Sequence, residues 1–427
     1  MSSIKDTENA PDGHASNPAG GANRGAVLLI AQTFPPSNMP GAWRPYRFFK
    51  YLTRSGFDVH VVTASAQHEE NPRIHHVPDQ AGPSKDTLGG WGQIFLRKFF
   101  LHGYDALGWW SKAVREGERI FERAPRAILS TSPPEAAHFA GRALQGRLRV
   151  PWIADFRDPI AGNDRTSPTP LSRWSNRFVE RRIFREADLL IANTDAAAEQ
   201  WRRRYPDWAP KIRHLWNGFD PDEALAAEPI PTRSGRTLTH VGSIYLGRSP
   251  RALVASLLRL QTDGRMEPGG LSLVLHGATQ EELATPKDLD RLKGLGGFEQ
   301  VGDPTRLGSR EDTGRAMATS DYLLVLDFHA SKQAIQVPSK LYAYLRIGRP
   351  IAALTQRGSP TERILERAGV PYVCMYPDDP PETFDANLLA LRELSTEPVR
   401  ASEWFWAEFD GKRQAERLAD WIGELGD

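Results

Sequence analysis

The segment VPSKLYAYLRIGRP, residues 337–350, places a lysine where a short helix is expected to begin. Pro338 has no N–H to leave unpaired and suits the first helical position, Ser339 is a common capping residue, and Gly348 can close the helix in the left-handed conformation. The first turn of a helix offers N–H groups and a partial positive charge, so Lys340 would strengthen an anion-binding site there. A phosphate is the usual ligand of such a site. The alternative is a solvated surface lysine with no ligand.

Other polar groups have the spacing of metal or acid–base chemistry. Two carboxylate pairs are candidates for metal ligands: Asp155 with Asp158, and Asp220 with Asp222. The second pair lies in a predicted linker and not at a strand end, and His75 with His76 is an isolated pair in a proline-rich loop. The sequence also lacks an H-E-x-x-H motif, so we predict no metal site.

Missing motifs and composition exclude several classes of protein. The first predicted strand is not followed by G-x-G-x-x-G, and no G-x-x-x-x-G-K-[ST] loop is present, so dinucleotide and NTPase chemistry lose their main support. A net charge of +1 gives no basic footprint for nucleic acid. The single cysteine, Cys374, rules out an internal disulfide and fits a reducing compartment.

Strand and helix patterns alternate along most of the chain. Short β-branched runs such as AVLLIA and DVHVVTA alternate with amphipathic helices, which is typical of a parallel sheet covered on both faces. The proline-rich stretch from 221 to 236 has the composition of a linker, and the same alternation restarts after it. We therefore predict an α/β protein with two Rossmann-like, doubly wound domains. The predicted parts are a disordered tail (1–24), an N-terminal domain (25–220), a linker (221–236), a C-terminal domain (237–400) and a terminal helix that crosses back to the first domain (401–427).

A series of ordered blocks carries a family resemblance. The blocks are FPPSNMPGAWRPYRFFKYLTRSGFDVHVVT, YDALGWWSKA, ILSTSPPEAAHFAG, PWIADFRDPI, EADLLIANTD, RHLWNGFD, THVGSIYLGRSP and VPSKLYAYLRIGRPIAAL. In this order the chain, from residue 27 to about 422, resembles a GT-B glycosyltransferase, most closely the retaining family four. The resemblance implies two domains facing across a cleft, an acceptor held mainly by the first, a nucleotide-sugar held mainly by the second, and no cofactor or obligatory metal.

The resemblance also implies site residues, most of them at the carboxyl ends of predicted strands, where ligands of α/β sheets bind. The donor is expected to contact Gly242, Ser243, Arg248, Ser339, Lys340 and Tyr342. The acceptor or sugar is expected near Gly41, Ala42, Arg44, Pro133 and His138. The catalytic candidates are Asp155, Arg157 and Asp158, which would orient sugar hydroxyls or pair with a phosphate; a salt-bridge network that only fixes the loop is the alternative. For Gly242 and Arg248 the alternatives are an ordinary turn and a surface arginine.

Two positions depart from the family pattern. Glutamates that are usual in the family are replaced by Ile335 and Ala343. The chain is therefore predicted to transfer a sugar, with retention, from a nucleotide-sugar to a saccharide, lipid-linked or small-molecule acceptor. A non-catalytic glycan-binding or partner subunit is the first alternative, and a nucleotide-sugar epimerase is the second.

Location follows from the same sequence. The tail lacks the apolar core of a signal peptide, and the apolar runs are far below the roughly 20 residues needed to span a bilayer. We expect a cytoplasmic protein. The aromatic, weakly basic segment 89–110 either docks peripherally on the inner face of the membrane or packs as a cover over the cleft.

Overall fold

The structure is a computed structural model that describes most of the chain. The described residues are 24–37, 39–65, 71–79, 108–121, 123–162, 169–225, 235–244, 248–279, 283–303, 310–327 and 335–426. Contacts divide the chain into two compact units, each taken by itself below. The first comprises residues 1–156, 169–190 and 415–427, and the second comprises residues 157–168 and 191–414.

The N-terminal part builds a seven-stranded sheet in the order β3-β2-β1-β4-β5-β6-β7. Its strands are β1 (Ala26–Ile30), β2 (Asp58–Thr63), β3 (Ile74–His76), β4 (Ala127–Ser132), β5 (Trp152–Phe156), β6 (Leu189–Ala192) and β7 (Ile212–His214). Its helices are η1 (Pro40–Ala42), α1 (Trp43–Arg54), α3 (Trp110–Ile120), α4 (Ala136–Leu148), α5 (Pro170–Glu186), α6 (Asp195–Arg204) and η2 (Pro206–Lys211).

The centre of this sheet is parallel and buried. In β1, Leu28 lies between His60 of β2 and Ile128 of β4, and the four strand pairs from β3 to β5 all run parallel. Every residue of β4 and β5 is buried, as expected for strands covered on both faces. Residues 415–427 also cluster with this unit, where Arg126 donates to the carbonyl oxygen of Gly423 at 3.1 Å.

The second unit contains a six-stranded sheet in the order β10-β9-β8-β11-β12-β13. Its strands are β8 (Arg236–Val241), β9 (Leu271–His276), β10 (Phe298–Val301), β11 (Tyr322–Leu326), β12 (Ile351–Leu354) and β13 (Tyr372–Met375). The helices are α7 (Arg251–Thr262), α8 (Pro286–Gly294), α9 (Arg310–Ala318), α10 (Lys340–Ile347), α11 (Pro360–Ala368), α12 (Pro381–Glu393) and α13 (Glu403–Phe409). The last helix, α14 (Gly411–Gly426), belongs to the first unit from residue 415 onward.

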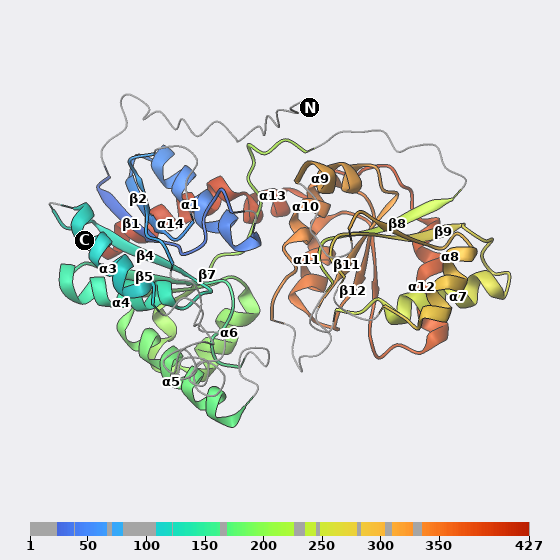
Figure 1. Ribbon diagram of the computed structural model, residues 1–427, viewed down its shortest axis with the longest axis horizontal. Helices are drawn as coiled ribbons and strands as arrows, with labels where there is room; N and C mark the ends of the chain where they lie inside the picture. The colour runs from blue at the N-terminus through green and yellow to red at the C-terminus, as the bar shows by residue number, and fades with distance from the viewer. Residues whose placement is uncertain are drawn as a thin grey trace, which may run out of the picture. The chain divides into compact units, whose positions relative to one another are not determined.

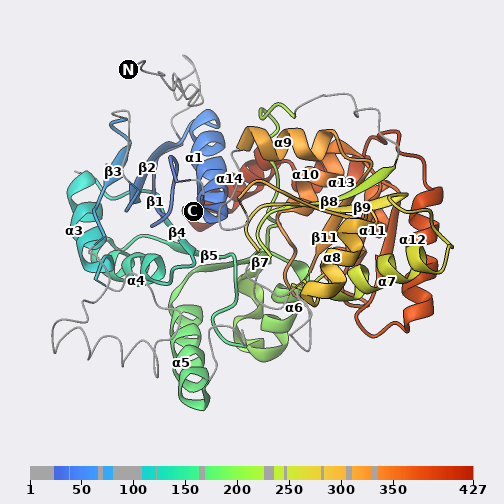
Figure 2. The same ribbon diagram turned by 45° about the vertical axis from the view of Figure 1, so that its right-hand side comes forward.

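Alternate residues of the central strand β11 enter two separate cores. Leu324 packs with residues of α7, α8 and α12 on one face of the sheet. Leu323 and Val325 pack with α10, α11 and α13 on the other face. Figures 1 and 2 show these helices in two layers around the sheet. The predicted α/β class with two Rossmann-like sheets is therefore confirmed.

The structure corrects several local predictions. His75 and His76 lie in the edge strand β3 and not in a loop, and His75 Nε2 lies 3.0 Å from His60 Nδ1 on β2. The short strands β7 and β10 were not predicted. Gly348 ends α10 in the left-handed conformation, as predicted, with φ of 80°. The domain boundaries stay predictions, and residues 1–23 and 80–107 lie outside the described part of the chain.

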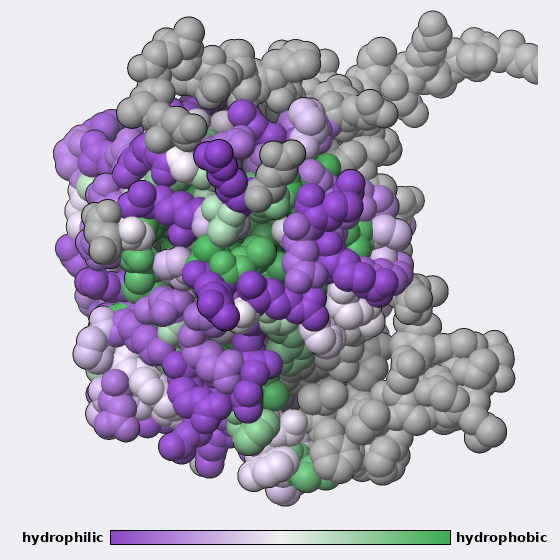
Figure 3. All heavy atoms as spheres, turned by 90° about the vertical axis from the view of Figure 1, so that its left-hand side faces the viewer, coloured by the Kyte–Doolittle hydropathy of each residue, from purple (hydrophilic) through white to green (hydrophobic). Residues whose placement is uncertain are grey.

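On the side of the molecule shown in Figure 3, hydrophilic residues predominate, and hydrophobic residues are visible mainly between them and toward the lower edge. No helix of the described residues is long and apolar enough to cross a membrane.

Candidate functional site

Lys340 and Gly242 meet at the carboxyl end of β8. The side chain of Lys340, the first residue of α10, lies directly over Gly242, which has a φ of +131°. A Cβ atom on Gly242 would fall 1.9 Å from Cε and 2.6 Å from Nζ of Lys340. The end of β9 is equally close, because a Cβ on Gly277 would fall 2.9 Å from the carbonyl carbon of Gly242. Glycine therefore allows the lysine and two strand ends to converge.

Lys340 has an unusual electrostatic environment. Burial, with a smaller contribution from the nearby Arg248, lowers the pKa of Lys340 to about 8. Among the residues that the structure describes, no hydrogen bond or ion pair satisfies its ammonium group. Two cations held near one another in this way favour an anionic ligand, because an anion removes both the desolvation penalty and the mutual repulsion.

His240, on β8, is a site residue that the sequence reasoning missed. Its ring is buried, and Nδ1–H donates to the carbonyl oxygen of Leu324 at 2.9 Å. Burial and the charges of Lys340 and Arg248 lower the pKa of His240 to about 3, so the ring is neutral and Nε2 can only accept a hydrogen bond. Nε2 has no partner among the described residues. The sequence feature that could have indicated His240 is the presence of a histidine within the predicted strand TLTHVG.

The beginning of α10 is fixed by other contacts than those predicted. Ser339 is exposed and its side chain accepts no capping hydrogen bond, so the predicted capping role is wrong. Tyr344 was also missed: its buried hydroxyl accepts a hydrogen bond from Val241 N–H at 3.0 Å and ties α10 to β8. Tyr342 is buried against Phe409, with ring centroids 5.1 Å apart, so its predicted contact with the donor stays a prediction. Ser243 follows Gly242 and is partly buried.

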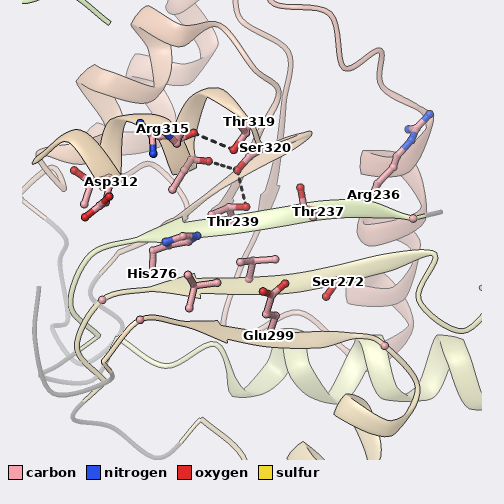
Figure 4. Close-up of a pocket in the computed structure, with 18 of the residues that line it drawn as sticks. Arg236, Thr237, Thr239, Ser272, His276, Glu299, Asp312, Arg315, Thr319 and Ser320 are labelled. Atoms are coloured by element: carbon pink, nitrogen blue, oxygen red, sulfur yellow. Dashed lines mark hydrogen bonds between the residues drawn. The ribbon is translucent and has the colours of Figure 1, made fainter. Parts of the chain in front are cut away.

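A trough of about 890 Å³, lined by both polar and apolar groups, runs along the sheet next to these groups. Figure 4 shows its walls: His276 and Glu299 rise from β9 and β10, and Asp312 and Arg315 extend from α9. The trough includes Gly277, so one end adjoins Gly242. The pKa of His276 is lowered by burial, although the nearby carboxylates of Glu299 and Asp312 oppose this.

In the first unit, two predicted site residues form a buried ion pair. Arg44 on α1 donates from Nη2 to Asp155 Oδ1 at 2.7 Å and from Nε to Oδ2 at 3.0 Å. Thr131 Oγ1 also donates to Asp155 Oδ2, at 2.8 Å. Arg44 and Asp155 are 1% and 0% exposed, so the pair joins the end of β5 to α1, and contacts of either residue with substrate stay predictions.

The remaining predicted residues lie in α4 and in the segments that follow β1, β4 and β5. His138 is buried, its Nδ1 lies 2.8 Å from Ser130 Oγ and its ring packs on Phe156, which gives it a role in the core. Pro133 follows β4, with cis peptide bonds on both sides. Gly41 and Ala42 form the turn before α1, and Arg157 and Asp158 follow β5 and are partly buried. Contacts of these residues with substrate stay predictions.

The described residues contain no group of three or more His, Cys, Asp or Glu side chains placed to hold a metal ion. The prediction of a metal-independent reaction stays untested.

Comparison with solved structures defines the fold. HepE from Anabaena, solved with UDP and glucose, has 14% identity and a TM-score of 0.58, with 94% of this chain and 100% of HepE covered. WaaG, a glycosyltransferase involved in lipopolysaccharide biosynthesis, has 14% identity and a TM-score of 0.56, with 93% and 99% covered. A glycosyltransferase from Rickettsia africae has 11% identity and a TM-score of 0.58, with 95% and 99% covered. The fold is therefore that of the GT-B glycosyltransferases.

The sequence match is more specific for the N-terminal part. Residues 41–218 match the family model of the Glycosyl transferase 4-like domain. The resemblance to GT-B glycosyltransferases of the family-four type is confirmed. No curated protein matches the chain in sequence.

Proposed function

We propose that the protein is a glycosyltransferase that uses a nucleotide-sugar donor and binds its diphosphate between Gly242, Lys340 and Arg248. One observation carries the proposal: Lys340 is a partly buried cation whose pKa is lowered to about 8, and no acidic group of the described residues pairs with it. A diphosphate supplies the missing negative charge, and the first turn of α10 adds its N–H dipoles. Neighbouring structures that contain UDP and UDP-glucose support this choice of ligand.

The same cations suit the transfer step. When the bond between the sugar carbon and the phosphate oxygen breaks, the electron pair leaves with the phosphate, and fixed cations stabilise that charge. The acceptor hydroxyl forms the new bond to the same carbon and gives its proton to the departing phosphate. We propose this front-face reaction, with retention and without an obligatory metal, because Lys340 and Arg248 already provide positive charge at the phosphate.

The trough offers a place for the nucleoside. It begins at Gly277, beside the proposed phosphate site, and its volume lies within the usual range of small-molecule pockets. The carboxyl ends of parallel strands are also where nucleotides bind in open α/β sheets. We therefore place the base and ribose at this end of the trough.

A thermal-shift screen with nucleoside diphosphates and nucleotide-sugars tests the proposal, with UDP and UDP-glucose as the first probes. A ligand at 100 times its Kd stabilises the folded state by about 2.7 kcal/mol, which raises Tm by roughly 5–10 °C for a unit of this size. Lys340→Met should reduce the shift strongly. Gly242→Ala should do the same, because the new methyl group displaces Lys340. Lys287→Met is the matched control, since Lys287 is an exposed lysine in the first turn of another helix, α8.

Failure of every nucleotide at millimolar concentration to shift Tm would refute the donor site. A donor that binds is then followed by NMR with candidate saccharide and lipid-linked acceptors. Release of nucleoside diphosphate that depends on the acceptor, with the donor's anomeric configuration kept, supports retaining transfer. Binding without turnover indicates the non-catalytic alternative favoured by Ile335 and Ala343, and conversion of the donor without any acceptor indicates an epimerase.

A further inference from the structure

Helix α5 exposes its apolar side chains. Leu171, Trp174 and Phe178 are 39%, 64% and 59% exposed, and they are three of the five large hydrophobic residues with exposure of this degree in the described part of the chain. Their spacing of three and four residues places them on one face of the helix. The rings of Trp174 and Phe178 stack, with centroids 6.0 Å apart and planes 17° apart, and Leu171 lies one turn earlier on the same face. We call these three side chains the apolar patch.

The inner face of the same turns is polar. Ser172, Ser175 and Asn176 are buried at 0%, 8% and 1% exposure. This reverses the usual pattern, in which a surface helix turns its apolar stripe toward the core. The N-terminus of the helix is nevertheless well capped, because Thr169 and Ser172 form a reciprocal capping box and Pro170 occupies the first turn. The outward apolar face is therefore a property of a well-formed helix and not of a frayed end.

Arginines surround the patch. The exposed residues of α5 include five of them: Arg173, Arg177, Arg181, Arg182 and Arg185. Of the two acidic residues of the helix, Glu180 is fully buried, and Glu186 offsets charge only at the last turn, where it pairs with Arg182 at 2.6 Å and Arg185 at 3.2 Å. Five arginines against two glutamates still leave the helix with a net positive charge. At 100° per residue, the arginines of the last two turns continue the line of the apolar patch, and Arg177 and then Arg173 lie to one side of it, next to Trp174. The face thus combines exposed aromatic rings with a strong positive charge.

We propose that this face of α5 docks the protein peripherally on an anionic lipid bilayer. Trp174, Phe178 and Leu171 would enter the headgroup region, where aromatic side chains are favoured, and the arginines would meet lipid phosphates. An apolar patch of this kind is expected to bind a second surface, and the positive charge around it selects a negatively charged one. The inference uses α5 alone and stands apart from the proposed donor site.

Co-sedimentation of the full-length protein with vesicles tests the inference. The vesicles contain phosphatidylcholine alone or with about 30% phosphatidylglycerol, at low and at physiological salt. We expect binding to the anionic vesicles only, weakened by salt. Each arginine near such a surface contributes about fivefold to partitioning, so Arg173→Gln with Arg177→Gln should reduce it about 25-fold. Trp174→Ser with Phe178→Ser should abolish it.

The controls separate this site from general charge and from misfolding. Lys287→Gln with Arg291→Gln removes the same charge from exposed positions of α8 and should leave partitioning within twofold of the wild type. All variants should keep the wild-type Tm, since the altered side chains are exposed. Wild-type protein that stays in the supernatant with anionic vesicles overturns the proposal. Equal losses in the α5 and α8 charge variants, or retention on nucleic acid without vesicle binding, overturn it as well.

Discussion

Nucleoside diphosphate affinity should fall as pH rises above about 8, and the reason is the lowered pKa of Lys340. In the free protein, burial and Arg248 hold the pKa of Lys340 at about 8. A bound diphosphate neutralises the site and returns the pKa toward the ordinary value of about 10.4, so binding takes up a proton at alkaline pH. The diphosphate itself is fully ionised above pH 7, because its last pKa is about 6, and arginine stays charged throughout. Lys340 is then the group that titrates.

The magnitude follows from the protonated fraction. At pH 7 about nine-tenths of Lys340 is protonated in the free protein, and at pH 9 about one-tenth is, so the Kd for UDP should rise about tenfold between these values. Isothermal titration calorimetry in buffers of different ionisation enthalpy measures both the Kd and the proton uptake. Lys340→Met should bind more weakly and with a flat pH profile, whereas Lys287→Met should retain the wild-type slope. A wild-type Kd that is constant from pH 7 to 9 would show that Lys340 does not contact the diphosphate.

Two further predictions concern the stability of the first unit. Asp155→Asn removes the carboxylate that pairs with the buried guanidinium of Arg44, so the free energy of unfolding in urea should fall by about 3–5 kcal/mol, and adding Arg44→Met should recover part of the loss; a loss under about 1 kcal/mol would contradict the geometry. The pKa of His75 is lowered, chiefly by burial and then by the adjacent His60. As pH falls, His75 therefore takes up its proton in the unfolded chain before it does so in the folded protein, and the free energy of unfolding should decrease below about pH 6.5. Urea midpoints at pH 5.5 and 7.5 should differ less in His75→Gln than in the wild type, and equal differences would exclude this residue.

The regular elements were predictable because long apolar runs and helical spacing are local signals. The strands predicted at AVLLIA and DVHVVTA are β1 and β2. The strands β3, β7 and β10 have only three or four residues, and β3 reads IHH, so they carry no alternation that a sequence window could detect. Their formation depends on pairing with a strand that is already in place, which is a tertiary effect.

The candidate site was predictable only in part. Its residues were chosen because their residue types suit ligand binding and they follow predicted strands, and the sequence does not show which other residues they contact. Gly242 and Lys340 were singled out, and the fold brings them together, since β8 and β11 pair and α10 begins beyond β11. The same reasoning treated Asp155 and Arg44 as separate ligand contacts, although 111 positions apart they satisfy one another.

No local sequence pattern predicts the pairing of Arg44 with Asp155, because the two residues are 111 positions apart. From sequence alone, both charged side chains would be expected at the surface, since burying a charge is costly unless it is paired. The contrast with Lys340 is informative. Asp155 already has its positive partner within its own unit, so a substrate contact at Asp155 would have to break an existing pair. Lys340 is largely removed from water and has no acidic partner among the described residues. A negatively charged ligand could therefore pair with Lys340 without breaking an existing ion pair. For this reason the donor phosphate is expected at the carboxyl end of β8 and not at the Asp155–Arg44 pair.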